Sequence, residues 1–146
     1  MATGAAYGQG EELWTARHNG SANAHDSAKA VVTDADGNVL FTGFERAIGT
    51  GDDAITRKYD SDGNLLWENR RAVVLNQIGW DIAVDSNGDA YVADSRFTVL
   101  KYDGASGELL WERAHGGNVL EGNVLELDSA GNVLVVGQRG GRVGLQ

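Results

Sequence analysis

The sequence predicts an all-β protein built from repeated four-stranded units. The pair Leu-Trp recurs at residues 13–14, 66–67 and 110–111, and a turn of the form D-x-x-G-[ND] follows each pair at a similar offset. The chain also has 21 glycines and no proline, which suits many short strands joined by glycine turns. Self-similarity at roughly 40 to 50 residues is typical of propeller blades, so the predicted fold is a β-propeller.

The first two strands of each unit flank the repeated turn. When the units are aligned on Gly37, Gly88 and Gly131, the first strands end "KAVVTD", "DIAVD" and "VLELD", and the second read "NVLFTG", "DAYVAD" and "NVLVVG". These segments alternate and are rich in β-branched residues, which predicts strands. In the turn, we expect Asp to accept backbone hydrogen bonds and Gly to adopt a positive φ.

A third and a fourth strand complete each unit. "AITRKYD" and "FTVLKYD" predict the third strand, and "LLWENRR" and "LLWERAH" the fourth after a further turn. Four antiparallel strands make one propeller blade. The chain is thus predicted to be one domain, 1–146, with units at about 13–65, 66–109 and 110–146 plus 1–12. We expect the repeated tryptophans to pack between blades.

One stretch resembles a known family closely. The segment "DIAVDSNGDAYVADSRFTVLKYDGASGELLW", residues 81–111, is similar to the unit of the bacterial β-propeller repeat often labelled SBBP. The resemblance implies the propeller fold. That family is a structural repeat without one activity, so the resemblance implies no catalytic residues.

The two ends of the sequence complement each other. The third unit stops at "RVGLQ", within its third strand, whereas "AYGQGEELW" near the start places Tyr7 where the other units have Tyr59 and Tyr102. This pattern predicts one blade built from both termini. Three blades cannot close a ring, which usually needs 4 to 8. A homodimer joined head to tail would form a six-bladed ring, and the alternatives are a fragment of a longer array or another ring size.

Composition excludes some partners and leaves others open. The chain has 146 residues, is 42% hydrophobic and 23% charged, and carries a net charge of −9, which opposes binding to nucleic acid. No apolar run reaches the roughly 18 residues of a membrane span, so no membrane partner is expected. The start lacks the pattern of a leader. The expected location is therefore cytoplasmic, or extracellular if a leader has been removed.

The variable loops suggest a ligand site. Binding residues in repeat proteins usually lie on varied loops held by a rigid scaffold. The first unit has an insertion, "GFERAIGTGDD", residues 43–53, which is expected to be a long variable loop. Trp80 stands where the other units have Lys29 and Asn123, and arginines lie in three of the loops. The candidate binding residues are Trp80, Arg96, Arg139, Arg46 and His25. The alternatives are that Trp80 fills a gap beside Gly79 and that the arginines pair with nearby acids.

The resulting interpretation is a non-enzymatic module that binds itself and a small molecule or protein, without a cofactor. One alternative is a metal-dependent hydrolase of the lactonase type, in which carboxylates in the channel would hold a divalent metal such as calcium. The carboxylates in question are Asp26, Asp81, Glu121 and Glu126. A second alternative is a carbohydrate-binding lectin.

Overall fold

The computed structural model describes residues 2–72, 76–115, 119–139 and 142–145, and side chains within 9–72, 76–115 and 123–137. These residues form antiparallel strands and turns and no helix, so no described helix could span a membrane. The strands are β1 (Ala2–Gly8), β2 (Glu11–His18), β3 (Ser27–Thr33), β4 (Val39–Ala47), β5 (Gly51–Tyr59), β6 (Leu65–Arg71), β7 (Gly79–Val84), β8 (Ala90–Asp94), β9 (Thr98–Tyr102), β10 (Leu109–Ala114), β11 (Val119–Leu127), β12 (Val133–Arg139) and β13 (Arg142–Leu145).

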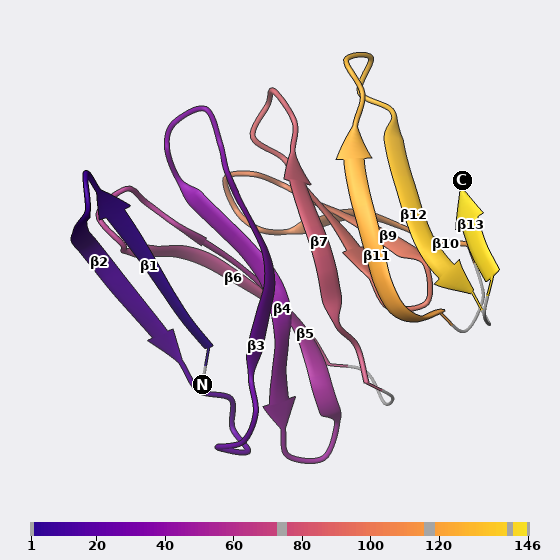
Figure 1. Cartoon of the computed structure of the whole chain (residues 1–146), viewed down its shortest axis with the longest axis horizontal. Coiled ribbons are helices and arrows are strands. Elements are labelled where there is room, and N and C mark those ends of the chain that lie inside the picture. The colour runs from indigo at the N-terminus through magenta and orange to yellow at the C-terminus, as the bar shows by residue number, and fades with distance from the viewer. Residues whose placement is uncertain (1, 73–75, 116–118, 140–141, 146) are drawn as a thin grey trace.

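The strands form four separate sheets that follow the chain (Figure 1). β3–β6 make the first sheet and β7–β10 the second, each with four strands in sequence order. The third sheet contains β11–β13, and β1 and β2 form a two-stranded hairpin. The inner strands β3, β7 and β11 contact one another in turn, as expected around a propeller axis. The four-strand meander of the predicted repeat is therefore present in the first two sheets.

The repeated turns have the predicted chemistry. In the first sheet, one carboxylate oxygen of Asp34 accepts hydrogen bonds from the backbone N–H groups of Asp36 and Asn38, at 3.0 and 2.9 Å. Gly37 has a φ of 81°, in the region that favours glycine. Burial alone would raise the pKa of Asp34, but hydrogen bonds from Lys58 and Asn38 outweigh it and lower the pKa to about 2. These aspartates serve the fold as charged turn caps.

The first unit differs from the sequence-based expectation. The segment 43–53 was expected to be a long variable loop, but it is mostly strand, because β4 continues to Ala47 and β5 begins at Gly51. Most side chains of this extension are buried, and Asp53 is 0% exposed. The short turn around Ile48 projects, with that side chain 78% exposed, and Arg46 is also exposed. The insertion lengthens a hairpin and leaves little free loop.

The two ends of the chain remain apart. β1 pairs with β2, and β13 pairs with β12, so the N-terminal hairpin and the third sheet are separate. Of the two, the hairpin lies beside the first sheet (Figure 1). The predicted blade from both termini is therefore not formed within this chain.

Candidate functional site

The loop end of the sheets, opposite the aspartate turns, holds the irregular residues. The inner strands β3 and β7 each have an irregularity in pairing at one position, Lys29 in β3 and Trp80 in β7. β11 is irregular between Glu121 and Val124, next to the aligned Asn123. Bulges re-aim side chains and recur near functional sites. Three different residues thus stand at one repeated position around the axis.

Trp80 and Lys29 lie together at this position. The Lys29 Nζ atom is 5.3 Å from the centroid of the Trp80 ring and 5.4 Å from that of Phe44. His25 contacts the other side of this group, with its ring centroid 5.6 Å from that of Phe44. Lys29 is exposed and Trp80 half-buried. The structure therefore brings predicted residues Trp80 and His25 into one aromatic group, with an ammonium between the two larger rings. Sequence reasoning missed Lys29 and Phe44 as members.

Asn123 differs from its two counterparts. It is 2% exposed, and its amide donates a hydrogen bond of 2.6 Å to the backbone carbonyl of Asp94. Asn123 therefore links the second sheet to the third. It is not part of the exposed group that Lys29 and Trp80 form.

Two of the three arginines predicted for this end have side chains among the described residues. Arg46 Nε lies 2.7 Å from an oxygen of Asp52, and the side chain of Arg46 is 45% exposed. Arg96 is exposed in the β8–β9 turn and has a φ of 68°, which is unusual for a residue other than glycine. The side chain of Arg139 lies outside the described residues. Arg46 thus has an acidic partner, and Arg96 projects from a tight turn.

Two of the proposed metal ligands accept hydrogen bonds from backbone N–H groups. Asp26 is 5% exposed and accepts the N–H groups of Gly20 and Arg46 at 2.8 and 2.9 Å. Asp81 accepts the N–H of Leu125 at 2.8 Å, which links β7 to β11. Glu126 is exposed, and the side chain of Glu121 lies outside the described residues. Among the described side chains, no three His, Cys, Asp or Glu residues are grouped for a metal.

A charge cluster with buried carboxylates and an exposed arginine lies between the hairpin and the first sheet. Arg70 pairs with Glu45 at 2.8 Å and with Asp53 at 2.6 Å. His18 binds Glu45 through Nε2, and its Nδ1 atom is 2.6 Å from the guanidinium of Arg57. Buried charges are costly unless paired, and here each has a partner. The adjacent pairs Asp52-Asp53 and Arg70-Arg71 in the sequence were the only signal for this cluster.

Asp94 is buried at the loop end of the second sheet. It stands where the other units have glycine, and it is 0% exposed. Its carboxylate lies 3.5 Å from Nε of Arg71 and accepts the side-chain amide of Gln77 at 2.7 Å. Burial raises the pKa of Asp94 to about 7, with Arg71 opposing the shift. This carboxyl group titrates near neutral pH.

Neighbouring sheets meet at joints built on one pattern. At the first joint, between the hairpin and the first sheet, the Trp14 ring lies 5.8 Å from Tyr59 and covers Gly63. At the second joint, between the first and second sheets, Trp67 lies 6.4 Å from Tyr102 and covers Gly107. A Cβ on either glycine would lie within 2.8 Å of the indole. Each joint therefore uses a tryptophan of one sheet with a tyrosine and a glycine of the next.

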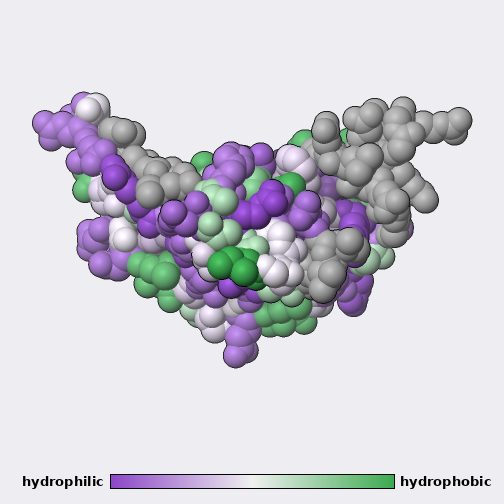
Figure 2. Space-filling view, turned by 90° about the horizontal axis from the view of Figure 1, so that it is seen from below, coloured by the Kyte–Doolittle hydropathy of each residue, from purple (hydrophilic) through white to green (hydrophobic). Residues whose placement is uncertain are grey.

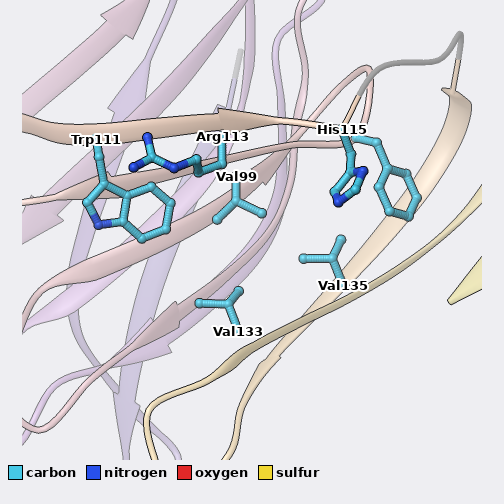
Figure 3. A pocket seen from close by; sticks show the side chains of 7 residues that line it. Val99, Trp111, Arg113, His115, Val133 and Val135 are labelled. Atoms are coloured by element: carbon cyan, nitrogen blue, oxygen red, sulfur yellow. The ribbon is translucent and has the colours of Figure 1, made fainter. Parts of the chain in front are cut away.

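At the third joint, between the second and third sheets, the described residues include no such tyrosine or glycine against the tryptophan. Trp111 contacts Tyr91 of its own sheet edge-on, at 5.8 Å, and remains half-buried. Beside it is an open pocket of about 220 Å³ (Figure 3). Its walls include Val99, Trp111, Arg113, His115, Val133 and Val135. Figure 3 shows the two valines of β12 facing the residues of β9 and β10 across this space.

Among the residues drawn in colour, Figure 2 shows the loop end with hydrophobic residues as separate spots on a mostly hydrophilic surface. The exposed group of Trp80 and Lys29 and the pocket of the third joint are therefore the two candidate binding features.

Comparisons with known proteins agree with this architecture. A family model described as "Outer membrane protein assembly factor BamB" matches residues 51–144. Among solved structures, a protein of unknown function from Bacteroides caccae has a TM-score of 0.59 and 16% identity over 92% of this chain and 49% of that chain. This chain therefore spans about half the length of that structure. No curated protein matches. At this identity, the structural likeness concerns the fold alone.

Proposed function

The chain belongs to the family described as outer membrane protein assembly factor BamB, and from that premise we propose that it is a non-enzymatic propeller module that binds a protein partner. The propeller-type repeat fold is the part that the family match supports directly. The finer resemblance to the SBBP repeat stays a prediction. The family description names an assembly factor, which favours a protein partner over a small substrate.

One observation carries this proposal. The scaffold repeats closely from sheet to sheet, but the bulge position on its inner strands holds Lys29, Trp80 and Asn123. A rigid repeat with one varied position around its axis is the usual arrangement of a binding surface. Tryptophan is enriched among residues that dominate binding energy at interfaces. Trp80 would supply the apolar contact, and the exposed ammonium of Lys29 would select an acidic or carboxyl-bearing partner.

The ring is part of the proposal. A second copy joined head to tail would give six blades, within the range in which propellers close. It would also remove the exposed sheet edges that a separate half-ring presents. Two copies would place two Trp80–Lys29 groups about one axis. A partner that touches both would gain avidity over a single contact.

A direct test uses arrays of random peptides and of glycans, probed with the labelled chain and with Trp80→Ala. Leu66→Ala is the matched control, because Leu66 is 50% exposed on an outer strand. We expect acidic peptides to bind the natural chain and the control, and to bind Trp80→Ala about tenfold or more weakly, since an interface tryptophan contributes about 2 kcal/mol or more. Unchanged peptide binding by Trp80→Ala would contradict the proposal.

The two other functions predict different results, the lectin on the same arrays and the hydrolase in a separate measurement of calcium binding and melting temperature. Glycans bound through Trp80, with no peptide bound, would favour the lectin. A stoichiometric calcium ion that raises the melting temperature would favour the metal-dependent hydrolase, because a ligand that binds only the folded state stabilises it.

A further inference from the structure

We infer that the pocket of the third joint is the docking site for the β1–β2 hairpin of a second copy of this chain. The Gly10 turn of that hairpin would cover Trp111, and its Tyr7 would lie opposite Val133 of β12. The inference rests on the two-copy ring proposed above and specifies which residues make it. Four observations support it.

The hairpin is the outer half of a blade. In β1–β2, Ala6 pairs with Trp14 and the register shifts next to Tyr7. The outer strands of the first sheet pair Lys58 with Trp67 and shift next to Tyr59 in the same way. The second sheet repeats the pattern, with Lys101 opposite Trp111 and the shift beyond it. The hairpin therefore has the backbone of a third and a fourth strand, without the two inner strands that accompany them elsewhere.

The third sheet has the complementary gap. Its β12 pairs with β13 only from Val136 to Arg139, so the edge of Val133 to Val135 has no third strand beside it among the described residues. In the complete sheets, the position of Val133 is opposite a tyrosine: Val39 pairs with Tyr59, and Ala90 with Tyr102. The same register would place Tyr7 opposite Val133 and Ala5 opposite Val135, next to the pair of Leu145 with Val136. In the complete joint, Ala2 to Gly4 of the second copy would leave their pairing with β2, because β13 holds the positions opposite Val136 to Gln138. Val133 and Val135 line the open pocket, so the missing strand and the pocket coincide.

The turn glycines give the third observation. Gly63 and Gly107 each have a positive φ and lie against the tryptophan of the preceding sheet. Gly10 holds the corresponding turn position in the hairpin, with a φ of 93°, but nothing lies within 4 Å of its Cβ direction. Trp111 is the tryptophan that lacks such a glycine. The free glycine and the uncovered indole therefore match.

The first and third sheets also each expose an apolar residue whose counterparts in the other sheets are buried. Val31 in the first sheet is 67% exposed, whereas its counterparts Ile82 and Leu125 are 5% and 4% exposed inside joints. Leu134 in the third sheet is 41% exposed, whereas its counterpart Leu40 is fully buried, at 0%. Leu40 packs with Ile82 at the second joint. Leu134 of one copy would pack against Val31 of the other in the same way.

A second copy is the fitting occupant because the hairpin is already committed at its other face. Trp14 packs on the first sheet of its own chain, through Tyr59 and Gly63. While the hairpin stays beside its own first sheet, the third sheet that it can contact is the third sheet of a second copy. Each copy then supplies one hairpin and accepts one, which is a closed two-fold arrangement.

Engineered cysteines test the register directly, because the chain has no cysteine of its own. Opposite residues of an antiparallel pair have Cα atoms about 4.5 to 5.5 Å apart, within the range of a disulfide. The test variant combines Tyr7→Cys with Val133→Cys. Val39→Cys with Tyr59→Cys, which are paired within the first sheet, calibrates the reaction. Thr3→Cys with Val133→Cys is the out-of-register control.

We expect oxidation of the test variant to give a covalent dimer and no larger species on a non-reducing gel, and the out-of-register control to stay monomeric. A ladder of higher multiples would overturn the two-copy ring while supporting this joint. A cross-link within one chain would overturn the second copy as occupant. Absence of the cross-link in a chain that is dimeric by light scattering would overturn the joint and leave the ring itself standing.

A second variant needs no cross-link. Gly10→Ala should weaken dimerisation about tenfold or more, because the added Cβ would meet Trp111 as it would meet the indoles at Gly63 and Gly107. Gly37→Ala is matched, since Gly37 also has a positive φ and open space around it. Both variants should lose similar folding stability. Equal dimer affinity of the two would contradict the contact between Gly10 and Trp111.

Discussion

The second and third joints use the same kinds of residue with different results. At the second joint, Trp67 is 6% exposed and packs with Ile82 and Tyr102 in a closed core. At the third joint, Trp111 has the same position in its sheet but borders an open pocket. The difference lies in the neighbouring sheet, which among the described residues has only the short β13 beyond its two inner strands. A repeated side chain thus serves as core or as docking surface according to what lies next to it.

The largest expected effect comes from removing the tryptophan of the closed joint. Trp67→Ala should lower the free energy of unfolding by about 3 to 5 kcal/mol, because it removes a buried aromatic side chain and leaves a cavity. Trp111→Ala should cost clearly less at protein concentrations where the chain is monomeric, since its ring is half-exposed there. Urea unfolding of both variants at low concentration measures the contrast. Equal losses would mean that the third joint is as closed as the second.

The pH dependence of the second joint is expected to be intermediate in size. Folding raises the pKa of Asp94 from 3.8 to about 7, so the folded chain holds this proton more tightly than the unfolded chain. The resulting stability is fully present below pH 3.8 and is lost as the pH rises through about 7. Its size is on the order of a few kcal/mol.

Asp94→Asn should remove this contribution and flatten the stability profile between pH 4 and 7. Thermal unfolding across that range measures it, and Asp60→Asn is a control in an exposed turn whose carboxyl pKa is lowered. The assignment would be contradicted if the stability of the natural chain changed between pH 4 and 7 by the same amount as the stability of the Asp94→Asn variant.

The smallest effect on folding is expected at the exposed end of the third sheet. Leu134→Asp should change the stability of the monomer by less than about 0.5 kcal/mol, because the side chain is already largely in water. It should nevertheless weaken the dimer, since Leu134 would face Val31 of the second copy. Leu110→Asp, on an outer strand and 49% exposed, is the control. Sedimentation at several concentrations would show whether only the first variant dissociates.

Much of the fold was predictable because its signals are local. The turn at Asp34 is defined by its own carboxylate and by Gly37, which are neighbours in sequence. The apolar and β-branched residues of β3 and β8 are likewise a local signal. The place of Tyr7 in the outer half of a blade also followed from sequence, and the pairing of β1 with β2 agrees with it.

The site was less predictable because it depends on distant residues. The segment 43–53 resembles a loop in sequence, but Asp53 is buried and pairs with Arg70 of the next strand, β6. Lys29 reaches Trp80 only because β3 lies beside β7. The raised pKa of Asp94 likewise depends on its burial, with Arg71 of the first sheet beside it. Such contacts have no signature in a single sequence.

The solution mass of the chain tests the central claim most directly, by light scattering over a wide range of protein concentration. The account predicts a species of twice 15.5 kDa that dissociates on dilution, and dissociates at higher concentration when Gly10 is replaced by alanine. A folded chain that remains at 15.5 kDa at every concentration would contradict it. The pocket beside Trp111 would then lack the partner proposed for it.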